Sequence, residues 1–184
     1  MIERLFSIEI FKYQCIDWEF KKQKILDIIN IENFKNNDND FVSSRNLDEK
    51  NSSQLKLNFS KIFLQELLRF SQELGVDNIS VRDVWSVKYN LNDFQAPHNH
   101  RSYSYSGILY VDYDEKCHQP TEFIAPWNHP IFDGTISKSI KNIKEGTIVF
   151  FPSFLLHYAP QNKTDKERKV ISFDLLINPC YDGI

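Results

Sequence analysis

The sequence predicts an α+β protein that is mainly β, with two helices ahead of a small β-barrel or jelly roll. Three observations support this class. Before residue 75, apolar residues recur at helical spacing in two segments. From residue 79 onward, short runs are rich in β-branched and aromatic residues. These runs follow one another instead of alternating with helices, which is the pattern of an antiparallel sheet.

The part of the chain before residue 79 is expected to form one strand and two helices. Residues 2–13 are rich in β-branched and aromatic side chains, which predicts a strand at a sheet edge. Residues 17–30 predict a helix, and the polar, asparagine-rich residues 31–54 predict a long loop that is either a lid or ordinary surface. Ser60 is expected to cap the second helix, which Gly75 ends. Its buried stripe would consist of Phe63, Leu64, Leu67, Leu68, Phe70 and Leu74.

The second part of the chain is expected to form the β core. The predicted strands are ISVRDVWSVKYN (79–90), YSYSGILYVDY (103–113), TEFIAP (121–126), GTIVFFP (146–152) and ERKVISFDLLIN (167–178). A length of 184 residues suits one domain. We therefore expect a single domain over residues 1–184, with residues 1–78 forming the N-terminal strand and helices and residues 79–178 forming the β-helix core.

Composition and charge make several classes of protein improbable. The net charge is −3 and no segment carries a dense run of lysine and arginine, so nucleic-acid binding is not indicated. Cys15, Cys117 and Cys180 are odd in number and far apart, which suits neither a disulfide framework nor a cysteine zinc site. There is no signal-peptide pattern and no apolar run of the ~20 residues that a membrane helix needs. We expect a cytoplasmic protein with no membrane partner.

Three histidines predict a metal centre. His98 and His100 form an H-x-H motif beside a tyrosine-rich strand, and residues i and i+2 of an extended segment share a face. His157 ends the run GTIVFFPSFLLH, and an antiparallel sheet folded over on itself could bring it beside the first two. Imidazole is the commonest metal ligand among side chains. By contrast, His118 and His129 lie in loop-like segments and are expected to be structural or surface residues.

The order of motifs along the chain resembles a known family. The motifs are W-S-V-K-Y (85–89), H-x-H (98–100), S-G-I-L-Y (106–110), E-G-T-I-V-F-F-P-S-F-L-L-H (145–157) and E-R-K-V-I-S-F (167–173). This order is similar to that of the small, uncharacterised bacterial and phage type of 2-oxoglutarate- and Fe(II)-dependent oxygenase, which is related to the prolyl hydroxylase-like enzymes. The resemblance extends over most of the chain. It implies a double-stranded β-helix, a jelly roll or cupin-like barrel, with the two N-terminal helices packed on it.

The resemblance also implies metal ligands. His98 would be the first iron ligand and His157 the last, whereas the family's second ligand is a carboxylate at the position that His100 occupies here. A set of two histidines and one carboxylate is the usual signature of such iron sites. Three readings follow. His100 could replace the carboxylate, a distant carboxylate such as Glu122 could bind instead, or the position could be vacant as in halogenating relatives. The last is disfavoured because imidazole is itself a competent ligand.

A second set of residues is implied for binding 2-oxoglutarate. Arg168 would bind the distal carboxylate of this cosubstrate with two parallel hydrogen bonds. Ser172, on the same strand and face, could add a hydroxyl. Tyr110 matches a tyrosine that reaches the same carboxylate in the hydroxylase-like relatives, and Tyr89 could act similarly from the preceding strand. The competing interpretations are core packing for the tyrosines and a solvated edge-strand charge for Arg168.

The function implied by the resemblance is a non-haem oxygenase that uses Fe(II), 2-oxoglutarate and O2, acting as a hydroxylase on an unidentified small molecule or protein side chain. One alternative is a cupin-type dioxygenase or isomerase with three histidine ligands and no use of 2-oxoglutarate, although residues 101–106 lack the usual cupin glutamate. Another alternative is a metal-free β-sandwich that serves as a binding module. Three imidazoles also suit zinc. The sequence leaves open whether the protein forms a homo-oligomer.

Overall fold

The computed structural model describes residues 7–29, 35–36, 44–45, 49–100, 103–129, 131 and 133–177. The helices in these ranges are α1 (Trp18–Ile29), α2 (Glu49–Ile62) and α3 (Leu64–Leu74). The strands are β1 (Phe11–Gln14), β2 (Lys35–Asn36), β3 (Ser44–Arg45), β4 (Ile79–Tyr89), β5 (Gln95–His98), β6 (Tyr105–Asp112), β7 (Glu122–Asn128), β8 (Thr135–Ser139), β9 (Thr147–Pro152), β10 (His157–Ala159) and β11 (Arg168–Ile177). None of the helices in this part of the chain is long and apolar enough to cross a membrane.

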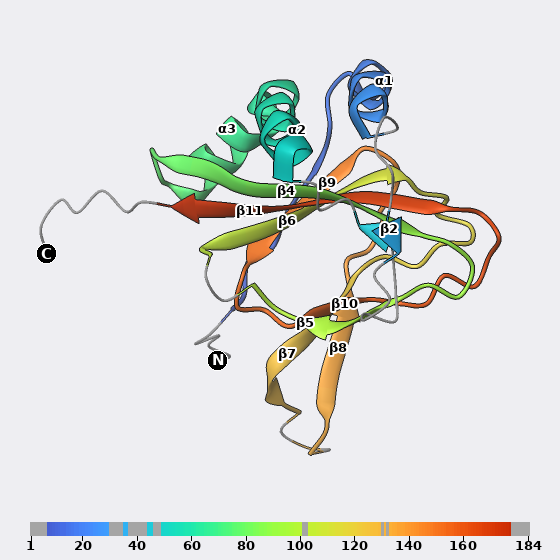
Figure 1. Ribbon diagram of the computed structural model, residues 1–184. Coiled ribbons are helices and arrows are strands. Elements are labelled where there is room, and N and C mark those ends of the chain that lie inside the picture. Colours follow the sequence, from blue (N-terminus) through green and yellow to red (C-terminus); the bar gives the residue numbers. More distant parts are fainter. Residues whose placement is uncertain are drawn as a thin grey trace, which may run out of the picture.

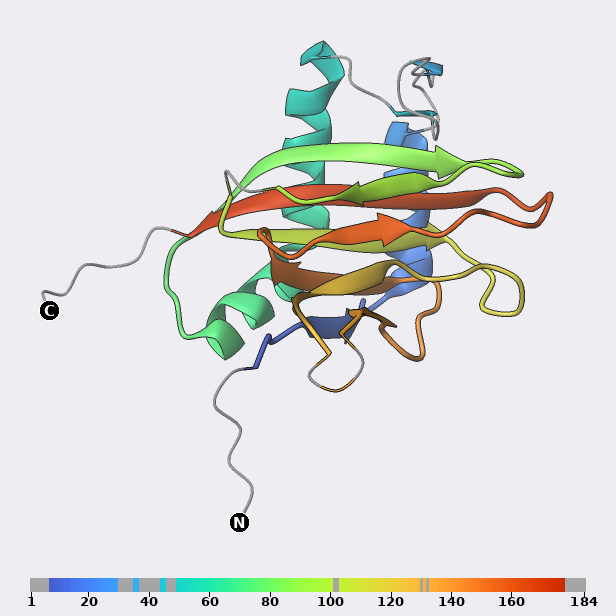
Figure 2. The ribbon, with the colours of Figure 1, turned by 90° about the horizontal axis from the view of Figure 1, so that it is seen from below.

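The strands form two antiparallel sheets. The larger sheet has the order β1-β9-β6-β11-β4-β3-β2, and the smaller has the order β5-β10-β7-β8. All three helices lie over one face of the larger sheet, and the smaller sheet lies over its other face (Figures 1 and 2). The prediction of a mainly β fold with N-terminal helices is thus confirmed. The division of the chain at residue 78 and the assignment of one domain stay predictions.

The long central strands are buried on both faces, and successive side chains pack into different cores. In β11, Ile171, Phe173 and Leu175 belong to the core beneath the helices, while Val170 belongs to a second core that faces the smaller sheet. This alternation is the two-residue period of a strand. The helix-facing layer is so tightly packed that a Cβ atom on Gly107 would lie 2.0 Å from the ring of Phe173. Close packing therefore explains the glycine of the S-G-I-L-Y motif.

The helical part differs from the prediction in number and in boundaries. α2 begins at Glu49, inside the predicted loop 31–54, and α3 is a separate helix, so the described residues before β4 form three helices where two were expected. Ser60 is not a cap, because it lies within α2 and its hydroxyl donates to the carbonyl of Lys56 at 2.8 Å. Most of the predicted loop, and with it the question of a lid, lies outside the described residues. Gly75 does end α3, with a left-handed φ of 75°.

The buried stripe of the predicted second helix is partly wrong. Phe63, Leu67 and Phe70 are buried as expected, but Leu64 and Leu68 are 52% and 51% exposed. The buried positions follow one another at intervals of three or four, and each of the two exposed leucines lies one position further around the helix. Because all of these residues are apolar, the sequence alone did not separate the buried positions of the helix from the exposed positions beside them.

The remaining elements agree with the prediction except for the short ones. The first helix matches the expected 17–30 closely, and all five predicted core strands are present. The N-terminal strand is at the sheet edge, as expected, but it comprises only Phe11–Gln14, because residues 7–10 have no regular structure and residues 1–6 lie outside the described residues. The short strands β5, β8 and β10 were not predicted, although two of them carry histidines of the H-x-H…H set.

Candidate metal centre

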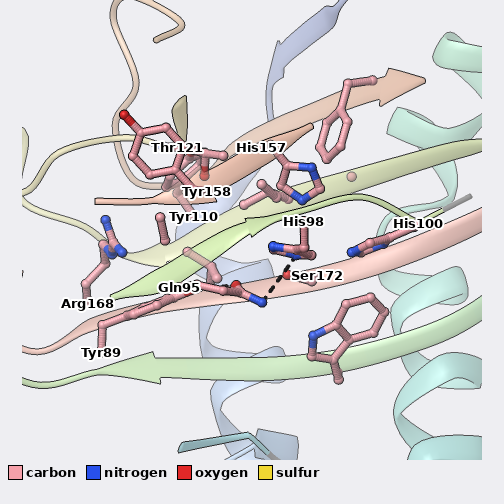
Figure 3. Close-up of a pocket in the computed structure, with 16 residues that line it drawn as sticks. Tyr89, Gln95, His98, His100, Tyr110, Thr121, His157, Tyr158, Arg168 and Ser172 are labelled. Carbon is pink, nitrogen blue, oxygen red and sulfur yellow. Dashed lines mark hydrogen bonds between the residues drawn. The ribbon is translucent and has the colours of Figure 1, made fainter. Parts of the chain in front are cut away.

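Three histidines converge between the two sheets. His98 ends β5 and His157 begins β10, and the two are direct partners in the antiparallel pairing of these strands. His100 follows β5, and its ring centroid lies 5.2 Å from that of His98 and 5.3 Å from that of His157. One ring nitrogen of each histidine lies within 4.8 Å of the other two. The three rings point toward one another (Figure 3), so all three could reach one ion.

The hydrogen bonds of the rings identify the nitrogens that face this point. His98 and His157 each donate Nδ1–H to the backbone carbonyl two residues earlier, at 2.8 and 3.0 Å. His100 donates Nδ1–H to the carboxylate of Asp174 at 2.7 Å. An acceptor at Nδ1 places the proton there and leaves the lone pair of Nε2 for a metal, which is the usual arrangement of metal-bound histidine. The residues present therefore fit a metal ion.

His157 is held in the neutral form that a metal requires. Its side chain is 4% exposed. Its pKa is lowered from the ordinary 6.5 to about 3, mainly by burial and then by the neighbouring imidazoles of His98 and His100, while the hydrogen bond to the Leu155 carbonyl opposes the shift. Protons therefore do not compete for this imidazole at neutral pH.

Asp174 was not identified by sequence reasoning, although it contacts one of the predicted ligands. It lies on β11, is 3% exposed, and accepts hydrogen bonds from His100 Nδ1 at 2.7 Å and from Ser106 Oγ at 2.6 Å. The signal in the sequence was an aspartate inside the apolar strand ISFDLLI, on the face that also presents Ser172. A buried acid in such a strand needs a polar partner.

The other candidates for metal binding lie elsewhere. Glu122 accepts hydrogen bonds from the hydroxyls of Tyr158 at 2.6 Å and Ser137 at 3.0 Å. His118 and His129 accept backbone N–H groups within their own loops, at 2.9 and 3.2 Å. In the described part of the chain, none of these three residues belongs to the group of potential ligands. Among the described residues, no carboxylate therefore lies beside the three histidines as a direct ligand.

Arg168 lies at the other end of the same pocket. It is 2% exposed and begins β11, which runs between β4 and β6 inside the larger sheet. The interpretation as a solvated edge-strand charge is therefore wrong. Its guanidinium lies 4.2 Å from the ring centroid of Tyr89 and donates to the backbone carbonyls of Gln119 at 2.5 Å and Pro160 at 3.4 Å. Its Nε, although buried, has no hydrogen-bond partner among the described residues.

The four residues predicted to bind the cosubstrate share one pocket with the histidines. The pocket has an empty volume of about 450 Å³, including its open mouth, and Arg168, Tyr89, Tyr110 and Ser172 all line it. The hydroxyl of Tyr110 accepts the backbone N–H of Thr121 at 3.1 Å. Figure 3 shows the arginine at one end of the pocket and the histidines at the other. The structure thus brings these residues together, and their roles stay predictions.

A glutamine connects the two ends of the pocket. The hydroxyl of Tyr89 donates to Oε1 of Gln95 at 3.0 Å, and Nε2 of Gln95 lies 3.2 Å from Nε2 of His98. Because the proton of this imidazole is on Nδ1, the amide of Gln95 donates to the metal-facing nitrogen (Figure 3). Sequence reasoning missed Gln95, since a single glutamine before H-x-H carries no signal by itself.

Comparison with solved structures shows the same fold. The carbocyclase SnoK from nogalamycin biosynthesis superposes with a TM-score of 0.70 at 9% identity, covering 92% of this chain and 80% of that one. HygX from Streptomyces hygroscopicus, solved with nickel, 2-oxoglutarate and hygromycin B, gives 0.69 at 10% identity, with 94% and 84% covered. A prolyl-4-hydroxylase from Pseudomonas putida gives 0.57 at 11% identity, with 94% of each chain covered. The expected double-stranded β-helix is thus confirmed.

Sequence comparison identifies the family. No curated protein matches the chain significantly in sequence. Residues 83–174, which are 92 of the 184 residues, match the family described as "Putative 2OG-Fe(II) oxygenase". The matched segment runs from β4 to β11 and includes the three histidines, Asp174 and Arg168. With half of its length matched, the chain belongs to the 2OG-Fe(II) oxygenase family.

Proposed function

We propose that this protein is an Fe(II)- and 2-oxoglutarate-dependent oxygenase that hydroxylates a small molecule or a protein side chain. The observation that carries the proposal is the content of one pocket. Three imidazoles whose Nε2 atoms face one point lie at one end, and a buried arginine that has no carboxylate partner among the described residues lies at the other. Family membership supports the same activity. The proposal also includes a cytoplasmic location and leaves open whether copies of the chain associate.

His98, His100 and His157 would hold Fe(II) through Nε2. Fe(II) supplies the redox chemistry of dioxygen, in which 2-oxoglutarate is oxidised to succinate and CO2 while the second substrate gains an oxygen atom. The protein's part is to fix the three imidazoles by their Nδ1–H bonds and to keep water from the pocket. Phe151 and Phe123, both buried, pack against the ring of His157 at centroid distances of 4.7 and 6.1 Å and supply that apolar wall.

Arg168 would bind the distal carboxylate of 2-oxoglutarate. In the described part of the chain no aspartate or glutamate forms an ion pair with it, so this buried guanidinium lacks a counter-charge from the protein. A buried charge without a partner is unfavourable, and a dicarboxylate in the pocket would provide one. The face of Tyr89 supports the guanidinium from one side, and Tyr110, which lines the same pocket, would add a hydroxyl. Ser172 also lines the pocket, but it lies beside the histidines, four positions along β11 from Arg168 (Figure 3).

A second candidate function rests on the ligand set itself. Three histidines without a carboxylate suit a metal enzyme of the cupin type that does not use 2-oxoglutarate, and they also suit zinc. Such an enzyme would have no use for a buried arginine at the far end of the pocket. Dependence on 2-oxoglutarate therefore distinguishes the two functions.

The test is an anaerobic titration with Fe(II) and then 2-oxoglutarate, in which the visible metal-to-ligand charge-transfer band is recorded. We expect the band in the wild type. Arg168→Met should still bind Fe(II) but need about 100-fold more 2-oxoglutarate, the usual effect of removing one partner of a buried charge pair. Arg82→Met, which removes an exposed arginine of β4, is the matched control and should behave as the wild type.

Each other outcome selects an alternative. If Fe(II) binds to the wild type but 2-oxoglutarate produces no band, the enzyme that does not use this cosubstrate is favoured. If neither Fe(II) nor Zn(II) binds, the protein is a metal-free binding module. If Arg168→Met and Arg82→Met titrate alike, Arg168 does not bind the cosubstrate.

A further inference from the structure

A buried carboxylate lies directly behind one of the three candidate metal ligands, at hydrogen-bond distance from its ring. Asp174 accepts the Nδ1–H of His100 at 2.7 Å, and its side chain is buried in the interior of the larger sheet. In the described part of the chain, no lysine or arginine forms an ion pair with Asp174, whose partner is the imidazole of His100. A buried carboxylate with only an imidazole as its ionic partner lacks a full positive counter-charge.

A chain of hydroxyls fixes Asp174 in this position. Ser106 on β6 is the register partner of Asp174 and donates its hydroxyl proton to the carboxylate at 2.6 Å. The hydroxyl of Ser153, 2.8 Å away, then donates to Ser106. Both serines are buried, at 1% and 0% exposure. Their hydrogen bonds leave the carboxylate little freedom to turn away from His100.

His100 is fixed from two directions by this same group of residues. Its backbone N–H donates to the carbonyl of Ser153 at 2.8 Å, and its Nδ1 lies 2.7 Å from the carboxylate of Asp174 and 3.2 Å from the hydroxyl of Ser106. His98 and His157 each donate Nδ1–H to a backbone carbonyl of their own segment. The Nδ1–H of His100 is donated to a carboxylate instead.

We propose that Asp174 is the carboxylate of this metal centre and acts through His100 as a positioning residue. The inference rests on the proposed function to the extent that a metal ion binds the three histidines. Asp174 holds the Nδ1–H tautomer of His100, so that Nε2 faces the ion. Its negative charge also makes the imidazole a stronger donor and offsets the charge of a divalent ion that three neutral ligands leave uncompensated.

This arrangement would account for His100 at the position where the resemblance described above implies a carboxylate ligand. A direct carboxylate ligand would carry its charge on the metal itself. Here the imidazole of His100 occupies that place and Asp174 carries the charge behind it, so the total charge of the site is unchanged. The hydrogen-bonded pair His100–Asp174 then serves as one extended ligand.

The experiment measures Co(II) binding to the metal-free protein by calorimetry and by the visible spectrum of bound Co(II). Asp174→Asn removes the charge but keeps an acceptor for Nδ1–H, and Asp174→Ala removes both. We expect affinity to fall about 10-fold for the first and about 100-fold for the second, the range typical of residues that support metal-bound histidine. Asp83→Asn is the matched control, because Asp83 is the register partner of Asp174 on β4 and is exposed.

A second readout does not require a metal. Nitrogen-15 NMR of the histidine rings in the metal-free protein should show His100 as the Nδ1–H tautomer in the wild type and in Asp174→Asn. In Asp174→Ala the ring should shift toward the Nε2–H tautomer that a histidine side chain prefers in water. Loss of stability alone would not change the tautomer of a folded protein, so this result separates positioning of the ring from a structural role.

The outcomes distinguish the two proposals. If the wild type binds Co(II) and both Asp174 variants bind it within twofold of the wild type, the inference about Asp174 is wrong and the proposed function stands. If the wild type binds no Co(II), the proposed function and the inference are both wrong. An unchanged tautomer in a folded Asp174→Ala protein also contradicts the positioning role.

Discussion

The two faces of the seven-stranded sheet carry different kinds of side chain, although the same strands supply both. On the helix side, Phe150 and Phe173 pack in a T-shaped contact at 5.3 Å, and Phe70 of α3 stacks on Phe150 at 4.4 Å. On the other side of the sheet, Arg168 of β11 lines the pocket, and Asp174 of the same strand contacts His100. A change of one position along a strand thus separates residues that stabilise the fold from residues that serve the site.

Charged residues show the same difference. Beneath the helices, Lys21 and Glu66 are both buried, and the ammonium contacts the two carboxylate oxygens at 2.7 and 2.9 Å. This pair is complete within the protein. On the pocket side, the buried guanidinium of Arg168 has no carboxylate partner among the described residues, and its Nε is unpaired. The complete pair stabilises the fold, whereas the buried guanidinium of Arg168 indicates where an anionic ligand is expected.

The largest expected effect tests the helix-facing side. Phe150→Ala should lower the free energy of unfolding by about 3–5 kcal/mol, because it removes a fully buried ring from the centre of the aromatic cluster. Urea unfolding measures the loss, and Co(II) affinity of the folded protein should not change. Phe154→Ala is the matched control, since that ring is 56% exposed and should contribute little. A large loss of Co(II) affinity in Phe150→Ala would show that the two faces are not independent.

An intermediate effect tests the pocket side through pH. Because the pKa of His157 is about 3 in the folded protein and 6.5 ordinarily, the unfolded chain binds a proton below pH 6.5 that the folded protein does not. Stability must then fall as pH falls, by about 2 kcal/mol between pH 6.5 and 5 for this group. Urea unfolding of the metal-free protein at pH 7, 6 and 5 measures it. His157→Gln should show a shallower dependence, and parallel profiles would contradict the assignment.

The smallest effect tests the link across the pocket. Gln95→Ala removes the amide that donates to Nε2 of His98, so the metal no longer competes with a hydrogen bond. The net free-energy contribution of one hydrogen bond is about 1 kcal/mol. The affinity for Co(II) without 2-oxoglutarate should therefore rise by up to about fivefold. Gln161→Ala, at an exposed glutamine, is the control. A fall in Co(II) affinity would mean that Gln95 helps to orient His98 for metal binding instead of competing with the metal for its Nε2.

The sequence predicted the long strands and the shared side of His98 and His100 because both depend on local patterns. Period-two alternation and β-branched residues mark β4, β6, β9 and β11, and H-x-H forces two imidazoles to one side of an extended segment. The short strands β5 and β10 have no such pattern, and they form because their neighbours in space provide hydrogen-bond partners. The start of α2 was missed since its first turns, EKNSSQ, are polar and resemble a loop.

Asp174 shows the limit of sequence reasoning most clearly. Its partner His100 lies in the segment after β5, and the contact depends on the pairing of β6 with β11 and on the path of the chain after β5. Neither is encoded in the residues near Asp174. Arg168 could be predicted by resemblance, but its burial follows from the interior position of β11 in the sheet, which local charge patterns did not indicate.

The positions of the three histidines have a consequence for the stability of the folded protein. His98 and His157 belong to the smaller sheet, whereas His100 is fastened to the larger one through Ser153 and Asp174. An ion bound by all three would act as a cross-link between the sheets. By mass action, free metal at 100 times its dissociation constant would then add about 2.7 kcal/mol to the stability of the folded protein. The concentration of free metal in the cell would thereby determine how stable the association of the two sheets is.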